Sequence, residues 1–143
     1  MSHYEERLET DLKQIRERVA EMAGMVEEAV NNSVHALRTG NLKLASATIL
    51  ADHPVNRLMR EIDQLCHGFI ARHLPSAGHL RFLSSVIRAN IQLERIGDYA
   101  VTIAREAIQL QVAPAGMLAR ELDRVAGETQ LMLRQAMTAF NEL

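Results

Sequence analysis

The apolar residues of this 143-residue chain recur every three or four positions, which is the spacing of one face of an α-helix. From Tyr4 to Arg38 they form a nearly unbroken heptad, which predicts one helix of about nine turns. Gly40 can adopt the left-handed conformation that ends such a helix. The inward face of this first helix is predicted to consist of Leu8, Leu12, Ile15, Val19, Met22, Val26, Ala29, Ser33 and Ala36.

A second apolar face runs from Leu42 to His73 and contains a proline. Pro54 lacks a backbone donor and crowds the carbonyl four residues before it, so we expect a kink or a restart of the helix near Asp52. The side chain of Asp52 is expected to cap the restarted helix. The predicted inward positions are Leu44, Ala47, Ala51, Val55, Leu58, Ile62, Leu65 and Phe69.

Two further helices complete the predicted elements. After a turn at residues 74–78, a third helix is expected from the N-cap Ser76 to about Gln111, and a break at residues 114–116 precedes the fourth. No segment alternates between apolar and polar residues, so we predict an all-α fold. The third inward face comprises Leu80, Leu83, Ile87, Asn90, Glu94, Gly97, Val101, Ala104 and Ile108. The fourth comprises Leu118, Leu122, Val125, Thr129, Met132, Ala136 and Ala139.

We predict that residues 1–113 form an antiparallel bundle of three long helices and that residues 114–143 add a fourth helix. The fourth segment echoes the first, with Ala126-Gly127 in the place of Ala23-Gly24. This echo predicts a second three-helix repeat that starts near Met117 and is cut off, and a genuine four-helix protein is the alternative. An unpaired fourth helix would expose its apolar stripe, so we expect it to pack on its own bundle or on a second copy of the chain.

Composition narrows the class of protein. The chain is 48% hydrophobic and carries sixteen basic against eighteen acidic residues without a charge block, so nothing in it favours nucleic acid. No apolar run approaches the roughly 18–20 residues of a transmembrane helix, and the polar N-terminus does not resemble a signal peptide. The single cysteine, Cys66, excludes an intrachain disulfide and fits a reducing compartment. These features predict a soluble, cytoplasmic protein.

Three positions on the third inward face do not suit a simple apolar core: Asn90, Glu94 and Gly97. Glu94 and Asp98 also stand four residues apart, where like charges on one helix face repel by about 0.2–0.5 kcal/mol. A carboxylate turned toward a core costs several kcal/mol unless it is protonated, paired or bound to a cation. The middle of the third helix is therefore the candidate functional site.

Helix register brings further polar residues to this site, because antiparallel helices pair residues that lie equally far from the turn between them. With the second turn centred near Pro75, Asp52 lies level with Asp98, and Asn56 lies level with Glu94. Both pairs come from the second and third helices. Polar side chains of two helices are thus expected in one layer of the bundle.

The first helix can add carboxylates to the same layer. With the first turn centred near residue 40, Glu28 falls level with Asp52, and Glu27 is its neighbour. Converging oxygen atoms between helices are how metal sites are built in bundles, and they suit Mg²⁺, Mn²⁺, Ca²⁺ or iron better than thiol-preferring metals. The candidate metal ligands are Glu94, Asp98, Asp52 and Asn56, with Glu27 and Glu28 as weaker candidates.

Structural salt bridges are the alternative interpretation of these carboxylates. Glu94 can pair with one of three nearby arginines while Asp98 stays solvated; these arginines are Arg57, Arg88 and Arg95. The sequence contains no nucleophile-and-base pair, no glycine-rich phosphate loop and no pair of histidines at metal-binding helical spacing. We therefore do not expect an enzyme or an organic cofactor.

The same residues carry a family likeness. Residues 75–81 (PSAGHLR) and 92–98 (QLERIGD) resemble the signature of the PhoU family of phosphate-transport regulators, approximately P-x-A-x-D-L-R followed by E-L-E-R-I-G-D. Residues 52–56 (DHPVN) and 24–27 (GMVE) are similar to the family's patterns in the second and first helices. The likeness covers most of residues 5–110.

This resemblance implies a fold of two tandem three-helix bundles, each with acidic motifs that bind iron or zinc, with manganese or magnesium still open. On this chain the motifs fall on Glu94 with Asp98 and on Asp52 with Asn56. The resemblance further implies a non-enzymatic, often homodimeric protein that restrains phosphate uptake and the phosphate-starvation response. Its implied partners are the phosphate ABC transporter, through its ATPase at the membrane periphery, and a sensor histidine kinase.

The chain departs from the family signature at three positions. His79 and Gln92 stand where the family usually has acidic residues, and Asn56 replaces a carboxylate of some members, which leaves metal identity and affinity open. A ferritin-like oxidase would need Glu-x-x-His pairs, whereas this chain has Glu61-x-x-Gln64. A metal-free helical interaction module and a domain linked to a sodium–phosphate cotransporter are also compatible with the sequence.

Overall fold

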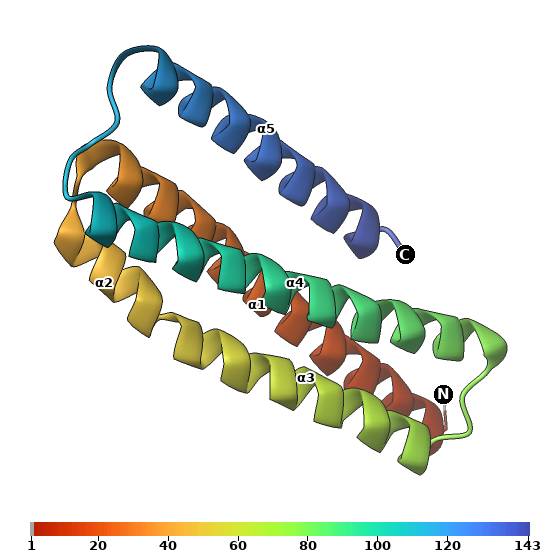
Figure 1. Cartoon of the computed structure of the whole chain (residues 1–143). Helices are drawn as coiled ribbons and strands as arrows, with labels where there is room; N and C mark the ends of the chain where they lie inside the picture. Colours follow the sequence, from red (N-terminus) through yellow and green to blue (C-terminus); the bar gives the residue numbers. More distant parts are fainter. Residues whose placement is uncertain (1) are drawn as a thin grey trace.

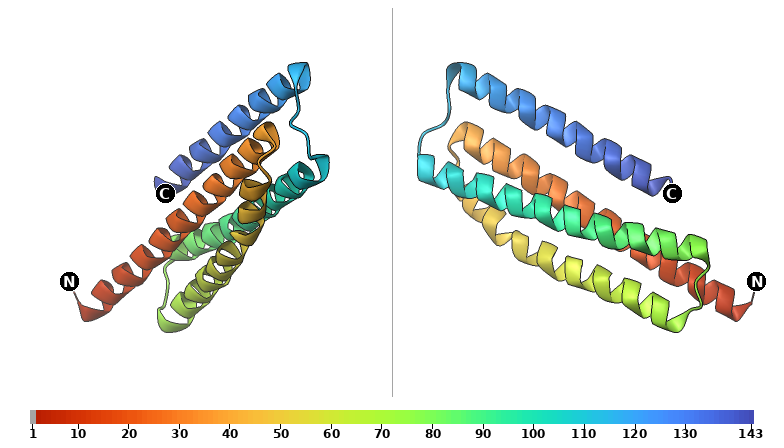
Figure 2. Two further views of the ribbon diagram at one scale, coloured as in Figure 1. Left: turned by 90° about the vertical axis from the view of Figure 1, so that its left-hand side faces the viewer. Right: turned by 45° about the vertical axis from the view of Figure 1, so that its right-hand side comes forward.

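The computed structural model describes residues 2–143, and these residues form helices joined by short turns, without β-strands. The helices α1, α2 with α3, and α4 form a long antiparallel three-helix bundle, and α5 lies alongside α1 at its edge (Figures 1 and 2). The all-α prediction is confirmed. The helices are α1 (His3–Thr39), α2 (Leu42–Leu50), α3 (Asp52–Arg72), α4 (Ala77–Leu110) and α5 (Gly116–Asn141).

Helix α1 begins and ends with the signals expected from its sequence. Ser2 accepts a hydrogen bond from the backbone N–H of Glu5, and the Glu5 side chain accepts one from the backbone N–H of Ser2 at 2.8 Å, which completes a capping box. At the other end Gly40 has φ 68° and ψ 25°, the left-handed conformation that favours glycine. Both ends lie within one residue of their predicted positions.

The predicted break near Pro54 is present, at Ala51, between α2 and α3. Proline fits the first turn of α3 because the amide hydrogens there have no partner inside the helix. Asp52 is the first residue of α3 and makes no capping bond, so its predicted capping role is wrong. The negative charge of Asp52 still interacts favourably with the positive, N-terminal end of the α3 dipole.

The inward face of α2 differs from the prediction. Ala47 and Ala51 are exposed, while Ala45 and Thr48 are buried. The observed stripe continues through the break by way of Asp52, which is partly buried, into the core face of α3. That core face consists of Val55, Leu58, Ile62, Cys66 and Phe69.

The core of the bundle lies between α1, α3 and α4. On α4 the predicted seam is shifted at several positions: Leu93 rather than Glu94 is fully buried, and Leu80 is 45% exposed. Glu94 therefore lies at the edge of the core, partly buried. The buried residues of α4 are Leu83, Val86, Asn90, Leu93, Gly97, Ala100, Val101, Ala104 and Ala107.

Helix α5 packs against the core through Leu133, Met137 and Phe140, ion pairs tie it to α1 as well, and Ala119 is its one buried residue. The Nε atom of Arg38 lies 2.5 Å from an Asp123 carboxylate oxygen, and the Nε atom of Arg134 lies 2.6 Å from an oxygen of Glu27. These pairs join α1 and α5 in antiparallel orientation. Within residues 2–143, no helix combines the length and apolar character needed to span a membrane.

Candidate metal-binding site

The candidate site is an acidic cluster, defined by Asp52 and Asn56 of α3 and by Glu94 and Asp98 of α4. The two helices approach closely here, where α4 carries Gly97. A Cβ atom at Gly97 would lie 3.5 Å from Oδ1 of Asp52, 3.6 Å from Val55 and 3.9 Å from Val26 of α1. The first turn of α3 thus lies directly against the middle of α4, and a Cβ atom at this position would still be at ordinary contact distance.

A buried hydrogen bond sets the register of the two helices beside the cluster. Asn90 is 2% exposed, and its Nδ2 atom donates to the carbonyl oxygen of Met59 at 2.9 Å. This pairing, like that of Gly97 with Asp52, differs by one residue from the register expected for a turn centred at Pro75. The predicted alignment of α3 with α4 is confirmed.

Within the cluster, Asn56 holds the carboxylate of Asp52. Its Nδ2 atom donates to Oδ2 of Asp52 at 3.1 Å, one helical turn away. The other oxygen of Asp52 faces Gly97 of α4. Asp52 is therefore fixed at the helix crossing with one oxygen directed toward the acidic helix.

Glu94 is the residue of the cluster whose pKa is shifted by its surroundings. Partial burial raises the pKa of Glu94, and the neighbouring carboxyl group of Asp98 and the negative charge of Asp52 raise it further. Arg95 acts in the opposite direction but is a smaller influence than either carboxylate. The site thus favours a proton, or another positive charge, beside Glu94.

Direct ion pairs do not supply that positive charge in the described part of the chain. The arginine and lysine pairs of residues 2–143 involve other carboxylates, so the expected salt bridges from Arg57, Arg88 or Arg95 to Glu94 are not formed. Asp98 is exposed, as the salt-bridge alternative required. Within residues 2–143, no direct pair with arginine or lysine therefore balances the charges of this cluster.

The weaker candidates on α1 lie outside the cluster. Glu27 is paired with Arg134 of α5, a contact that the sequence pattern did not reveal. Glu28 lines a hollow of about 300 Å³ beside Ala51 and Pro54, at the level of the break between α2 and α3. Glu28 lies at the level along the bundle that the register predicts, but it faces this hollow and not the acidic cluster.

The cluster is not a complete coordination sphere. Among residues 2–143, no three side chains of His, Cys, Asp or Glu converge closely enough to hold a metal ion. Asn56 also directs its NH₂ group, a donor, toward Asp52. The donor set suits a hard cation in its chemistry, but the side chains would have to move to enclose one.

Comparison with known proteins assigns the family. Residues 19–107, more than half of the chain, match the family model described as the PhoU domain. The chain belongs to the PhoU family. The resemblance identified from the signature segments is therefore confirmed.

Relatives of this PhoU-family chain extend beyond its length. It is 35% identical over 141 residues to the phosphate-specific transport system accessory protein PhoU homolog of Pseudomonas aeruginosa, covering 96% of the chain and 57% of that protein. It is 31% identical to the PhoU accessory protein of Escherichia coli, with the same coverage. The crystal structure of PhoU from Pseudomonas aeruginosa superposes with a TM-score of 0.88 at 35% identity, covering 94% of this chain and 65% of that one.

We expect the neutral substitution Glu94→Gln to stabilise the chain at pH 7 by about 0.2–0.5 kcal/mol, since it removes a like-charge pair at helical spacing. Folding raises the pKa of Glu94, so its penalty on folding grows as the pH rises from the unfolded pKa to the folded pKa and is fully present above the folded pKa. The difference between variant and parent should therefore vanish near pH 3, where the carboxyl group is protonated in both states. Urea unfolding at both pH values measures it.

The matched control is Glu9→Gln, which removes one negative charge from an exposed position of α1. This variant should leave the free energy of unfolding unchanged within about 0.5 kcal/mol, as surface substitutions usually do. If Glu94→Gln and Glu9→Gln behave alike at both pH values, Glu94 is not strained by its neighbours.

Proposed function

We propose that this PhoU-family chain is a non-enzymatic regulator of phosphate uptake and of the phosphate-starvation response. The observation that carries the proposal is its similarity, over 96% of its length, to accessory proteins of the phosphate-specific transport system. It spans 57% of the length of these relatives. The proposal therefore concerns what this part of such a protein contributes.

The regulator acts by docking rather than by chemistry. Its partners are the ATPase of the phosphate ABC transporter and the sensor histidine kinase, which it contacts in the cytoplasm at the membrane periphery. The acidic cluster supports a docking role because Asp98 is exposed and Tyr99, its neighbour, is 62% exposed. An acidic patch beside an exposed aromatic ring is suited to a basic surface on a partner, which it would attract electrostatically.

The acidic cluster also binds a metal cation, in this proposal. Three observations support it: the raised pKa of Glu94, the nearby charge of Asp52, and the lack of an arginine partner within the described residues. Glu94, Asp98 and Asp52 would supply carboxylate oxygens, and Asn56 its amide oxygen after a side-chain rotation. Iron, zinc, manganese and magnesium are the candidate ions, and the ion would neutralise the cluster and stiffen the crossing of α3 and α4.

Binding of the purified chain to the cytoplasmic ATPase and to the cytoplasmic part of the kinase, followed by biolayer interferometry, tests the docking role. Binding should weaken about tenfold or more for Asp98→Lys, because the charge of an exposed contact residue is reversed. The control Glu9→Lys makes the same charge change on an exposed part of α1 and should bind like the parent. Failure of the parent chain to bind either partner would refute the docking role.

A further inference from the structure

The hollow that Glu28 faces lies between α1 and the break that separates α2 from α3, and its volume is about 300 Å³. Its walls are formed largely by short apolar side chains, with Ala29 on α1 and Ala47 and Ala51 on the opposite side. These side chains do not reach across the space between the helices, and Pro54 lines its α3 end. A volume of this size is at the lower limit of ligand sites, so the hollow fits one small group.

The hollow lies on the side of α1 that faces away from α5. Helices α2 and α5 both pack on α1 without contacting each other, and they lie on opposite sides of it (Figure 2). Glu27 of α1 pairs with Arg134 of α5, whereas Glu28, about 100° further round the helix, faces the hollow. The hollow is therefore formed by the three-helix bundle alone.

The polar groups that line the hollow favour a cation. Glu28 is the one charged lining residue, and the others with polar side chains are Asn32 and Thr48. The Oγ1 atom of Thr48 already donates its proton to the carbonyl oxygen of Leu44 at 2.9 Å, so it can only accept a further hydrogen bond. The lining thus offers a carboxylate and acceptor oxygens, and no basic group.

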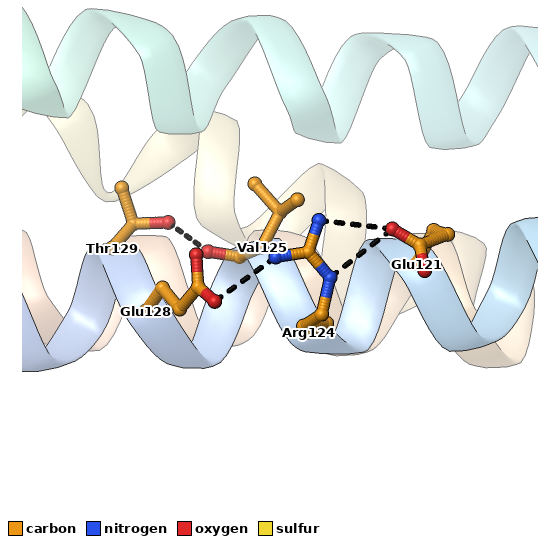
Figure 3. A network of polar contacts seen from close by, with 5 residues as sticks. All are labelled: Glu121, Arg124, Val125, Glu128 and Thr129. Carbon is orange, nitrogen blue, oxygen red and sulfur yellow. Dashed lines mark hydrogen bonds and ion pairs between the residues drawn. The ribbon is translucent and has the colours of Figure 1, made fainter.

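Glu28 lacks the ion-pair partner that several other glutamates have. Figure 3 shows Arg124 between Glu121 and Glu128, at 3.0 and 2.9 Å from their carboxylate oxygens. In the part of the chain that the structure describes, no basic side chain lies within ion-pair distance of Glu28. Its carboxylate, at the exposed mouth of the hollow, is available to an external cation.

We propose that the hollow binds an alkylammonium group, either the side chain of a lysine on another protein or a free alkylamine. The ammonium group would donate to Glu28 and to the amide oxygen of Asn32, one helical turn away, while the methylene stem lies against Ala47 and Pro54. A hydrated metal ion would gain nothing from the apolar walls, and a neutral alkyl group would gain nothing from the carboxylate. The combination indicates a cation with an aliphatic stem.

Titration of the full 143-residue chain with n-butylammonium chloride, followed by amide NMR spectra, tests the site. Shifts should concentrate on Glu28, Asn32 and Ala47, with a Kd of about 1–10 mM, since one exposed charge and a short stem support only weak binding. Sodium chloride is lowered in step to keep the ionic strength constant. Methylammonium, which lacks most of the stem, should bind about fivefold more weakly or worse, and uncharged n-butanol should also bind more weakly.

Two pairs of variants separate charge from space. Glu28→Gln should weaken binding of butylammonium by about three- to fivefold, the range for an exposed ion pair, whereas Glu9→Gln, exposed on α1 outside the hollow, should bind like the parent. Ala47→Leu fills the hollow and should abolish binding. Ser46→Leu enlarges the neighbouring exposed residue, which does not line the hollow, and should not. Circular dichroism would confirm that each variant folds.

A blocked lysine, acetylated at its α-amino group and amidated at its carboxyl group, distinguishes the two sources of the alkylammonium group. Binding as tight as that of butylammonium assigns the hollow to a lysine side chain of another protein, and weaker binding assigns it to a free amine. The proposal is overturned if butylammonium does not bind at up to about 100 mM. It is equally overturned if the parent, Glu28→Gln and Ala47→Leu bind butylammonium alike.

Discussion

Replacing Gly97 by leucine is expected to destabilise the chain by about 1–3 kcal/mol, the usual cost of overpacking a well-filled contact. A Cβ atom at this position would already touch Asp52, Val55 and Val26 at 3.5–3.9 Å, so the rest of a leucine side chain has no room. Relief requires α3 to move away from α4, which would also separate Asp52 from Glu94. Urea unfolding measures the lost stability, and a smaller pH dependence of stability would report the separated charges.

Two controls separate crowding from helix propensity. Gly97→Ala adds only the Cβ atom at ordinary contact distances, and alanine is favoured over glycine inside a helix by about 1 kcal/mol, so this variant should not be destabilised. Gly127→Leu introduces the same leucine side chain at a helical glycine of α5. A Cβ atom at Gly127 would have no neighbouring atom within 4 Å, so this variant should be neutral or stabilising. If Gly97→Leu were as stable as Gly127→Leu, the contact between α3 and α4 would not limit the size of the side chain at position 97.

The helix boundaries could be read from the sequence because they depend on local signals. Gly40 ends α1 through its own backbone freedom, and Ser76 caps α4 by accepting a hydrogen bond from the backbone N–H of His79. Pro54 marks the break between α2 and α3 through its missing donor. None of these effects depends on the distant part of the chain.

The inward face of α2 was harder to predict from the sequence than the helix boundaries. Alanines occur on both faces of this short helix, so Ala47 looked as apolar as the buried Ala45, and the buried position of Thr48 looked polar. The stripe that is buried in the structure passes through Asp52, a residue that a hydrophobic pattern passes over. The wrong inward face of α2 and the unpredicted place of Asp52 on the buried stripe therefore have the same cause: the hydrophobic pattern does not count a polar residue as buried.

The acidic cluster was predictable in its register but not in its details. Equal distances from the turn placed Asp52 near Asp98 and Asn56 near Glu94, and packing of antiparallel helices preserves that relation. The partner of Glu27 depended on where α5 docks, since Arg134 lies more than a hundred residues away in sequence. Whether carboxylates converge on one point depends on side-chain rotamers, which residue spacing does not specify.

Metal binding at the acidic cluster is expected to stabilise the chain by about 2.7 kcal/mol when the free ion is present at a hundred times its Kd. The physical source is the neutralisation of Glu94, Asp98 and Asp52, whose mutual repulsion and partial burial raise the pKa of Glu94. Thermal unfolding of chelator-treated protein, titrated separately with Mn²⁺, Zn²⁺, Mg²⁺ and Fe²⁺, measures the effect. Elemental analysis of protein purified without chelator identifies the ion that is retained.

The double variant Glu94→Gln, Asp98→Asn keeps the size of both side chains and removes both charges, so it should be more stable than the parent without metal and should gain little from any of the ions. Glu27→Gln is the matched control: it removes a carboxylate that Arg134 occupies and should leave the metal response intact. Equal stabilisation of parent and double variant would place the ion elsewhere. If no ion stabilises the parent, the cluster is a strained docking surface, and the charge of Asp98 would act only through a partner protein.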